Sequence, residues 1–356
     1  MKKLFIPLIL TLILGIGACS TDFDITSDWK EITIVYGLLN PKDDVQYIRI
    51  QKAFLSEDVS ALEVAEVGDS LYHNSNGEAL SAILEEYRIV NEDQIGSLRR
   101  TITLEKVSGS EEGLQKEEGV FATNPYFLYK TNADIRQDHI YRLIVNTPAG
   151  NVVSSECRMV KDFTVSRPDS QIPVGFLSDF RMTWLPAENA AVYDVDMYFN
   201  YTETRKVDGQ DVTEQKRIKW DALTNGQADV LTNGVGSLQA ELTSERFLNF
   251  LANNIEVDVN VVKREVKNLD FTIWAGSEDF LTFNQVALAQ FGITSSQAQP
   301  TYTNVENGVG LFTSRFRKEI IDVSLTGPTI DLIACGDITG NLGFARDPNN
   351  PTQNCQ

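Results

Sequence analysis

The chain has few histidines and few basic residues for its size. Its 356 residues include two histidines, His73 and His139, and 31 basic against 50 acidic side chains. With so few histidines, a serine or cysteine nucleophile has few bases to activate it. The formal net charge of −19 argues against nucleic acid or an anionic lipid surface as a partner, because both need a positive protein surface.

Motifs that carry chemistry are also missing. The sequence contains no G-x-S-x-G elbow, no H-E-x-x-H pair and no C-x-x-C pair. The glycine-rich turns at 233–237 and 307–312 do not open a helix after a strand, as a phosphate-binding loop requires. We therefore expect a protein that is not an enzyme, with no catalytic residues, no metal site and no cofactor.

Acidic side chains leave two alternatives open. Asp194 and Asp196 share a strand face, and Asp270, Glu278 and Asp279 cluster in sequence. Either group could supply the paired carboxylates of a glycoside hydrolase. Hard oxygen ligands also suit calcium in an extracytoplasmic loop, and residues 40–44 and 335–341 are the candidate segments for it.

The first strongly apolar run, residues 4–16, is too short to cross a bilayer. About 13 helical residues span roughly 20 Å, against ~30 Å of hydrocarbon. The run follows Lys2 and Lys3 and ends in Ile16-Gly17-Ala18 before Cys19, so residues 1–18 are a signal peptide. An aliphatic and two small residues before a cysteine resemble the bacterial lipobox, which implies a lipid on Cys19 and a stable membrane anchor. An ordinary secretory signal is the alternative.

Residues 19–30 are small, polar and acidic, which is typical of a flexible tether. Acidic residues directly behind the lipidated cysteine resemble the surface-export signals of outer-membrane lipoproteins in Bacteroidota. That resemblance implies an outer-membrane protein exposed at the cell surface. A solvated linker without meaning for export is the alternative.

The remaining cysteines suggest one disulfide bond. Cys335 and Cys355 both lie in the C-terminal tail, and an exported chain meets a compartment that permits oxidation. Their bridge would close a loop of about twenty residues and contribute roughly 3 kcal/mol in the chain-entropy model. Cys157, alone in a strand-like run, is expected to be a small buried side chain.

Residues 31–165 are predicted to form an antiparallel β-sandwich domain. Alternating apolar residues recur in short runs, with turn signals about every ten residues. The clearest hairpin has strands on either side of Pro148-Ala149-Gly150.

Residues 174–330 are predicted to form a second β-rich domain, followed by a tail at 331–356. Trp184 and Tyr193 are spaced as in an immunoglobulin or fibronectin type III-like strand pair, which places both in the core. Asp208-Gly209 predicts a hairpin turn. Two helices are expected within this half, near 243–254 and 278–291, because apolar residues recur there at helical spacing behind Thr243 or Ser244 and behind Ser277.

These elements occur in an order that resembles a known family. The lipobox, "VYGLLNP" near residue 35, "YRLIVNTPAGN" and "TNVENGVGLFTSR" near the end are similar to uncharacterised outer-membrane lipoproteins of Bacteroidota, whose domain has no known function. The resemblance implies a link with TonB-dependent receptors and nutrient uptake, and it offers no catalytic residues. The tail departs from the family, which closes with glycine, cysteine and aromatic residues.

Three functions follow in order of expectation. The first is a non-enzymatic accessory or binding subunit of a TonB-dependent uptake system, anchored to the outer membrane. The second is a stand-alone surface module that binds a glycan or peptide, in which exposed Trp220, Trp274 or Tyr302 would stack on sugar rings. The third is a hydrolase with paired carboxylates.

Overall fold

The computed structural model describes residues 32–53, 71–73, 80–91, 94–116, 125–232, 235–290 and 302–346. The predicted signal peptide, Cys19, the tether and Cys355 lie outside the described residues. The described part is mainly β, as the sequence predicted, and most neighbouring strands pair antiparallel.

The strands of the first half are short, and most follow the alternation read from the sequence. They are β1 (Ile32–Leu39), β2 (Gln46–Ala53), β3 (Ser81–Asn91), β4 (Gln94–Thr103), β5 (Glu105–Ser108), β6 (Phe127–Thr131), β7 (His139–Asn146), β8 (Val152–Arg158) and β9 (Val165–Arg167).

The second half has longer strands and most of the helical residues. Its elements are β10 (Phe180–Trp184), β11 (Val192–Val207), β12 (Gln210–Gln227), α3 (Ala228–Leu231), β13 (Leu238–Leu242), α4 (Ser244–Asn254), β14 (Val261–Gly276), α5 (Glu278–Gln290), β15 (Gly308–Val323), α6 (Gly327–Cys335) and η2 (Gly340–Leu342).

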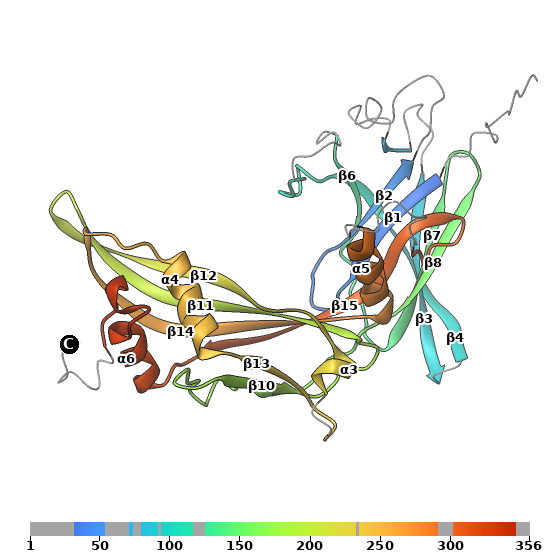
Figure 1. Cartoon of the computed structure of the whole chain (residues 1–356). Coiled ribbons are helices and arrows are strands. Elements are labelled where there is room, and N and C mark those ends of the chain that lie inside the picture. The colour runs from blue at the N-terminus through green and yellow to red at the C-terminus, as the bar shows by residue number, and fades with distance from the viewer. Residues whose placement is uncertain are drawn as a thin grey trace, which may run out of the picture.

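One eight-stranded sheet, here called the platform sheet, runs through both halves of the molecule. Its strand order is β12-β11-β14-β15-β1-β2-β6-β5. A four-stranded sheet, β4-β3-β7-β8, and a three-stranded sheet, β13-β10-β9, complete the β structure. Figure 1 shows the molecule as elongated, with the long strands β11, β12 and β14 at one end and the shorter strands at the other.

Strand β15 joins the two ends of the platform sheet. Its first half pairs parallel with β1, from Gly308 opposite Thr33 to Ser314 opposite Leu39. Its second half pairs antiparallel with β14, from Arg315 opposite Gly276 onward. A single strand therefore belongs to both ends of the molecule, a connection that the strand-by-strand sequence reading did not predict.

The inner face of the platform sheet carries two hydrophobic clusters. The first cluster lies between β1, β2 and β6 and the four-stranded sheet, and it includes Val305 and Phe312. The second lies between the long strands, the three-stranded sheet, α4 and α6, and it includes Phe316. Part of the predicted second domain thus packs with the first, while the predicted division at 165–174 itself stays a prediction.

The predicted core pair and hairpins are present. Trp184 and Tyr193 are both fully buried, and their ring centroids lie 5.6 Å apart. Asp208 and Gly209, with φ of 51° and 82°, turn β11 back into β12. These features fit the predicted sandwich class, while its immunoglobulin or fibronectin type III character stays a prediction.

Both predicted helices are confirmed. The Thr243 hydroxyl accepts a hydrogen bond from the Arg246 N–H at 3.4 Å and caps α4, and the Ser277 hydroxyl accepts from the Phe280 N–H at 3.2 Å at the start of α5. Helix α6 was not predicted and crosses the expected boundary at residue 330. Ile330, Ile333 and Ala334 do recur at helical spacing behind Pro328, but the helix is only nine residues long and was read as part of the tail.

Candidate functional site

The outer face of the platform sheet carries two adjoining pockets. An aromatic pocket of about 350 Å³ lies on β1, β2 and β15, and an acidic pocket of about 370 Å³ lies on β11, β12 and β14. Both are lined by Phe280 of α5 and by Arg315 of β15. We call the pair of pockets the cleft.

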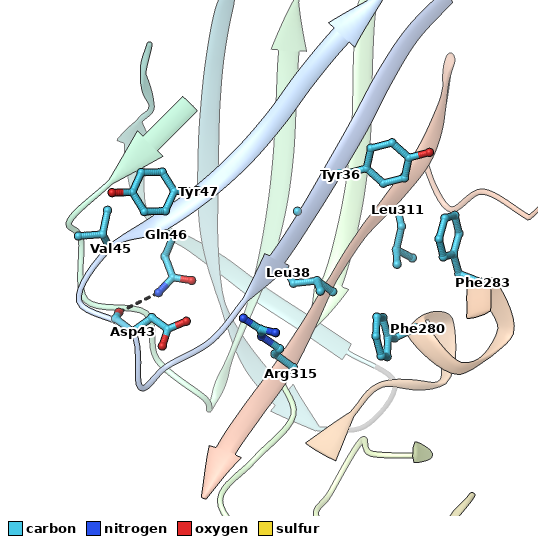
Figure 2. Close-up of a pocket in the computed structure, with 11 residues that line it drawn as sticks. Tyr36, Leu38, Asp43, Val45, Gln46, Tyr47, Phe280, Phe283, Leu311 and Arg315 are labelled. Carbon is cyan, nitrogen blue, oxygen red and sulfur yellow. Dashed lines mark hydrogen bonds between the residues drawn. The ribbon is translucent and has the colours of Figure 1, made fainter. Parts of the chain in front are cut away.

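Helix α5 forms one wall of the aromatic pocket. Phe283 meets Tyr36 edge to face, with ring centroids 5.9 Å apart, and Phe280 lies next to it on the helix. Figure 2 shows these phenylalanines on one side, the β1–β2 turn with Asp43 on the other, and Leu38 and Arg315 between them. The pocket is therefore largely apolar and contains one guanidinium group.

Local sequence fixes the position of α5 on the sheet. The Ser277 and Thr313 hydroxyls, both buried, lie 2.6 Å apart and join the start of the helix to β15. Gly276 leaves room for the helix, because a Cβ there would lie 2.7 Å from the Phe280 ring. The hydroxyl contact between Ser277 and Thr313, together with the absence of a side chain at Gly276, thus allows Phe280 to pack over the sheet.

Arg315 is half-buried, and Asp43 attracts it without forming an ion pair with it. Its guanidinium lies over the Trp274 ring, 4.4 Å from the centroid. Its Nε is buried with no hydrogen-bond partner in the described residues, and no carboxylate of those residues lies within ion-pair distance of it. Burial lowers the pKa of Arg315 below its ordinary value. Because buried charges are normally paired, this arginine is suited to bind an anion.

A second arginine lies beside the first but is occupied. Arg317 is 5.8 Å from the Trp274 centroid, and its Nη1 lies 3.3 Å from Asp43 Oδ1. Trp274 thus has two guanidinium groups over it, an arrangement in which the π face offsets part of the cost of burying charge. Arg315 lines both pockets and forms no ion pair with a carboxylate of the described residues, although Asp43 lies in the same pocket.

The acidic pocket contains three aspartates and one lysine. Lys219 Nζ lies 3.0 Å from Asp196 Oδ1 and 2.9 Å from Asp221 Oδ1, so one ammonium is shared by two carboxylates. The hydrogen bond to Asp221 is the main cause that raises the pKa of Lys219, and the same bond lowers the pKa of Asp221. The Trp274 Nε1–H donates to Asp196 Oδ2 at 3.1 Å.

Asp194 is the aspartate of this pocket that forms no ion pair in the described part of the chain, although Lys219 lies near enough to attract it. One carboxylate oxygen accepts the Asn225 N–H at 2.6 Å. Burial, the largest cause, raises the pKa of Asp194. Asp194 and Asp196 project side by side from β11 rather than toward each other across a cleft, as a glycosidase pair would.

The structure describes two of the cysteines. Cys335, at the end of α6, is disulfide-bonded, while the expected pairing with Cys355 involves a residue outside the described part and stays a prediction. Cys157 is a free thiol in β8 and is 2% exposed, as expected. Burial is the main cause that raises the pKa of the Cys157 thiol.

Both histidines are buried, which the sequence did not indicate. His139 begins β7, with its Nδ1 2.7 Å from Asp138 Oδ1 and its Nε2 3.8 Å from Glu86 Oε1. His73 Nε2 lies 3.4 Å from the Thr33 hydroxyl. Within the described ranges, no group of three or more His, Cys, Asp or Glu side chains is arranged to hold a metal ion.

The candidate sugar-stacking aromatics differ in exposure. Trp220 stacks on Phe250 at 5.7 Å and is 9% exposed, so it belongs to the core. Tyr302 donates its hydroxyl to Asp279 at the start of α5. Trp274 alone of these three lines the cleft, and its guanidinium neighbours give it a polar environment.

Sequence reasoning missed the arginines and phenylalanines of the cleft. Arg315 lies between the buried Ser314 and Phe316 in β15, and this alternation was a signal that it shares a face with Arg317. Which strands flank β15 depends on the parallel pairing with β1, and periodicity does not encode that pairing.

No helix in the described part of the chain has both the length and the apolar character needed to cross a membrane.

Comparison with known proteins gives no family for the chain. No protein-family model matches it, and no curated protein matches it. The C-terminal globular domain of an oligosaccharyltransferase from Pyrococcus abyssi is 11% identical over 56% of this chain and 34% of that chain, with a TM-score of 0.17. The match thus spans about a third of that structure. CBD12 from CALX1.2 is 9% identical over 80% of this chain and 100% of that chain, with a TM-score of 0.13. Neither similarity carries an argument about fold or function.

Proposed function

We propose that this protein is a non-enzymatic lipoprotein, anchored to the outer membrane through Cys19, that binds a ligand for a TonB-dependent nutrient-uptake system. The observation that carries the binding role is the half-buried Arg315, whose buried Nε has no hydrogen-bond partner among the described residues, in a cleft with aromatic walls. Ligand sites are typically concave and largely apolar, with a few placed polar groups, and the cleft fits that description.

The arrangement of charges supports binding rather than hydrolysis. Two of the three aspartates of the acidic pocket share Lys219, which occupies an oxygen of each. A paired-acid hydrolase needs one carboxyl group that stays protonated and a second that faces it across the substrate. The side-by-side aspartates on β11 provide no such opposed pair.

The alternative is a surface module that binds a glycan or peptide without a receptor. The observation that favours it is Trp274, which presents part of its ring to the cleft and could stack on a ligand. In that case the isolated protein would bind ligand with full affinity and would not co-purify with a receptor.

The anchor is tested with the variant Cys19→Ala and the matched control Ser20→Ala. We expect Cys19→Ala to move the protein from the membrane to the soluble fraction, because the anchoring acyl chains are lost, and Ser20→Ala to stay membrane-bound. Retention of Cys19→Ala in membranes would remove the lipid anchor from the proposal.

The uptake role is tested by affinity purification of the tagged protein from its own detergent-solubilised outer membranes. We expect a TonB-dependent β-barrel to co-purify, and deletion of the gene to slow growth on the transported nutrient. Purification without a barrel, together with unchanged growth, would favour the stand-alone module.

A further inference from the structure

We propose that the cleft binds short peptides of two or three residues, with the terminal carboxylate on Arg315, an apolar C-terminal side chain in the aromatic pocket and the terminal ammonium at Asp194. This inference rests on the proposed binding function and names the class of ligand for the same site. Three features of the cleft point to this ligand: a positive group and a negative group that form no ion pairs among the described residues, and an apolar recess beside the positive group.

Arg315 supplies the carboxylate end. A guanidinium binds a carboxylate through two parallel N–H···O bonds, and this geometry suits a terminal carboxylate. The group is already desolvated at its Nε and held by the Trp274 ring, so binding requires little further ordering. Asp43, on the β1–β2 turn, is ion-paired with Arg317 at 3.3 Å and attracts Arg315 only at longer range, so the Arg315 guanidinium keeps its hydrogen-bond donors for a ligand.

Asp194 supplies the ammonium end. Its neighbours Asp196 and Asp221 are both bound to Lys219, whereas Asp194 accepts only the Asn225 N–H among described groups. An ammonium group placed there would hydrogen-bond a carboxylate that burial otherwise disfavours.

The separation of the two groups sets the ligand length. Arg315 lies opposite Gly276 on β14, and Asp194 on β11 lies opposite Trp274, two residues further along. The two residues are separated by two strand-to-strand spacings of about 4.8 Å across the sheet and by two residues of about 3.3 Å along the strands. Together these offsets place the Cα atoms of Arg315 and Asp194 about 12 Å apart. An extended peptide spans roughly 3.3–3.6 Å per residue, so two or three residues fit between the two side chains.

The aromatic pocket supplies a site for the last side chain. It opens directly at Arg315, because that residue and Phe280 line both pockets. Its other walls include Leu38, Phe283 and Leu311. A leucine or phenylalanine at the C-terminus would bury its side chain there while its carboxylate reached Arg315. Trp274 lines the acidic pocket between Arg315 and Asp194 in the sheet register.

The experiment measures binding of Ala-Ala-Phe to the full lipoprotein in detergent micelles by isothermal titration calorimetry. The comparison ligands are its C-terminal amide, its N-acetyl form, and digalacturonic acid as an anionic sugar. We expect the amide to bind about 10- to 100-fold more weakly than the free tripeptide, because it removes one charge-assisted pair, and the acetylated form to lose affinity by a smaller factor.

The variants test the same contacts from the protein side. Arg315→Gln should weaken Ala-Ala-Phe about 10- to 100-fold and remove the difference between the acid and the amide. Asp194→Asn, which keeps the acceptor for the Asn225 N–H, should remove the difference between free and acetylated peptide. Arg181→Gln, an exposed arginine paired with Glu241 on another sheet, is the matched control and should bind normally.

Failed folding is separated from failed binding by thermal melting of each variant. Arg315→Gln removes a charge that burial disfavours together with its contact to the Trp274 ring, so its melting temperature should change little. Tighter, Arg315-dependent binding of digalacturonic acid than of the peptide would overturn the peptide inference and leave the binding function. If the protein co-purifies with a barrel but binds none of the probes, the peptide inference is overturned and the proposed uptake role stands. No binding and no barrel would overturn both.

Discussion

At the residue scale, a buried ion pair joins β11 to β14 far from the cleft. Glu203 Oε2 accepts from Arg264 Nε at 2.8 Å, and Arg264 is 3% exposed. Arg264 also donates to the carbonyl oxygens of Glu256, at 2.8 Å, and of Leu342. Arg205 Nη2 reaches Glu203 Oε1 at 2.7 Å. One carboxylate is therefore shared by two arginines, and Arg264 connects the long strands to the C-terminal segment.

Replacing this carboxylate should destabilise the protein. We expect Glu203→Gln to lower the free energy of unfolding by about 3 kcal/mol, because Arg264 would stay buried without a counter-charge. Chemical denaturation monitored by circular dichroism measures the change. Glu214→Gln, in an exposed pair with Lys216, is the matched control and should have little effect. Equal effects of the two substitutions would contradict this account.

The same carboxylate gives stability a dependence on pH. Burial opposes its ionisation, but hydrogen bonds from Arg264 and Arg205 outweigh burial and lower the pKa of Glu203. A lowered folded-state pKa means that the contribution is present above the unfolded pKa and is lost as pH falls through the folded value. Wild-type stability should therefore decline more steeply in acid than that of Glu203→Gln.

At the element scale, the parallel pairing of β1 with β15 depends on one glycine. Gly310 has a φ of +117°, and a Cβ at this position would lie 2.0 Å from the Val35 carbonyl oxygen. The backbones of β1 and β15 thus approach more closely here than a side chain permits. The sequence reading placed a turn at 307–312, and Asn307, with φ of 55°, does turn before the strand begins.

We expect Gly310→Ala to destabilise the protein by at least about 2 kcal/mol, because it adds both backbone strain and a steric clash. Gly150→Ala is the matched control, since Gly150 has a φ of 81° but open space around its Cβ position. The two variants are compared by their midpoints of chemical denaturation, provided that the dependence of the unfolding free energy on denaturant concentration is the same in both. A Gly310→Ala protein as stable as Gly150→Ala would show that the close approach has no energetic role.

The sequence predicted single elements better than their partners. Alternation in β7 and β8, and the Asp208-Gly209 turn, place residues on faces and join neighbouring strands, because both signals are local. The pairing of β1 with β15 connects residues some 270 positions apart, as Thr33 opposite Gly308 shows, and nothing local encodes it. The cleft depends on that pairing, so Arg315 had no predicted neighbours.

At the scale of the whole molecule, Ser314 lies where the two hydrophobic clusters meet. Its hydroxyl accepts from the Val160 N–H and donates to the Arg158 carbonyl oxygen, both at 2.8 Å, and the residue is fully buried. Phe312 on one side belongs to the first cluster and Phe316 on the other belongs to the second. This serine therefore provides hydrogen-bond partners for the backbone groups of Arg158 and Val160, where the chain leaves β8.

Ser314→Ala should cost about 1–3 kcal/mol by leaving a buried backbone donor without its partner. Because β15 is common to both clusters, we expect one unfolding transition, with tryptophan fluorescence and circular dichroism changing together in wild type. Ser110→Ala, on an exposed turn, is the matched control and should melt like wild type. Two separate transitions in wild type would show that the ends unfold independently.

The parallel register of β1 and β15 also has a mechanical consequence. β1 is the first described element after the segment that we expect to hold the lipid, so tension from the membrane would enter the body at its amino end. If the load leaves through the carboxyl end of β15, the two parallel strands are pulled in opposite directions along their length. The hydrogen bonds between β1 and β15, from Thr33 to Leu39, would then bear the load together rather than break one after another. A pull from the bilayer would meet its greatest resistance at the strand that carries Arg315.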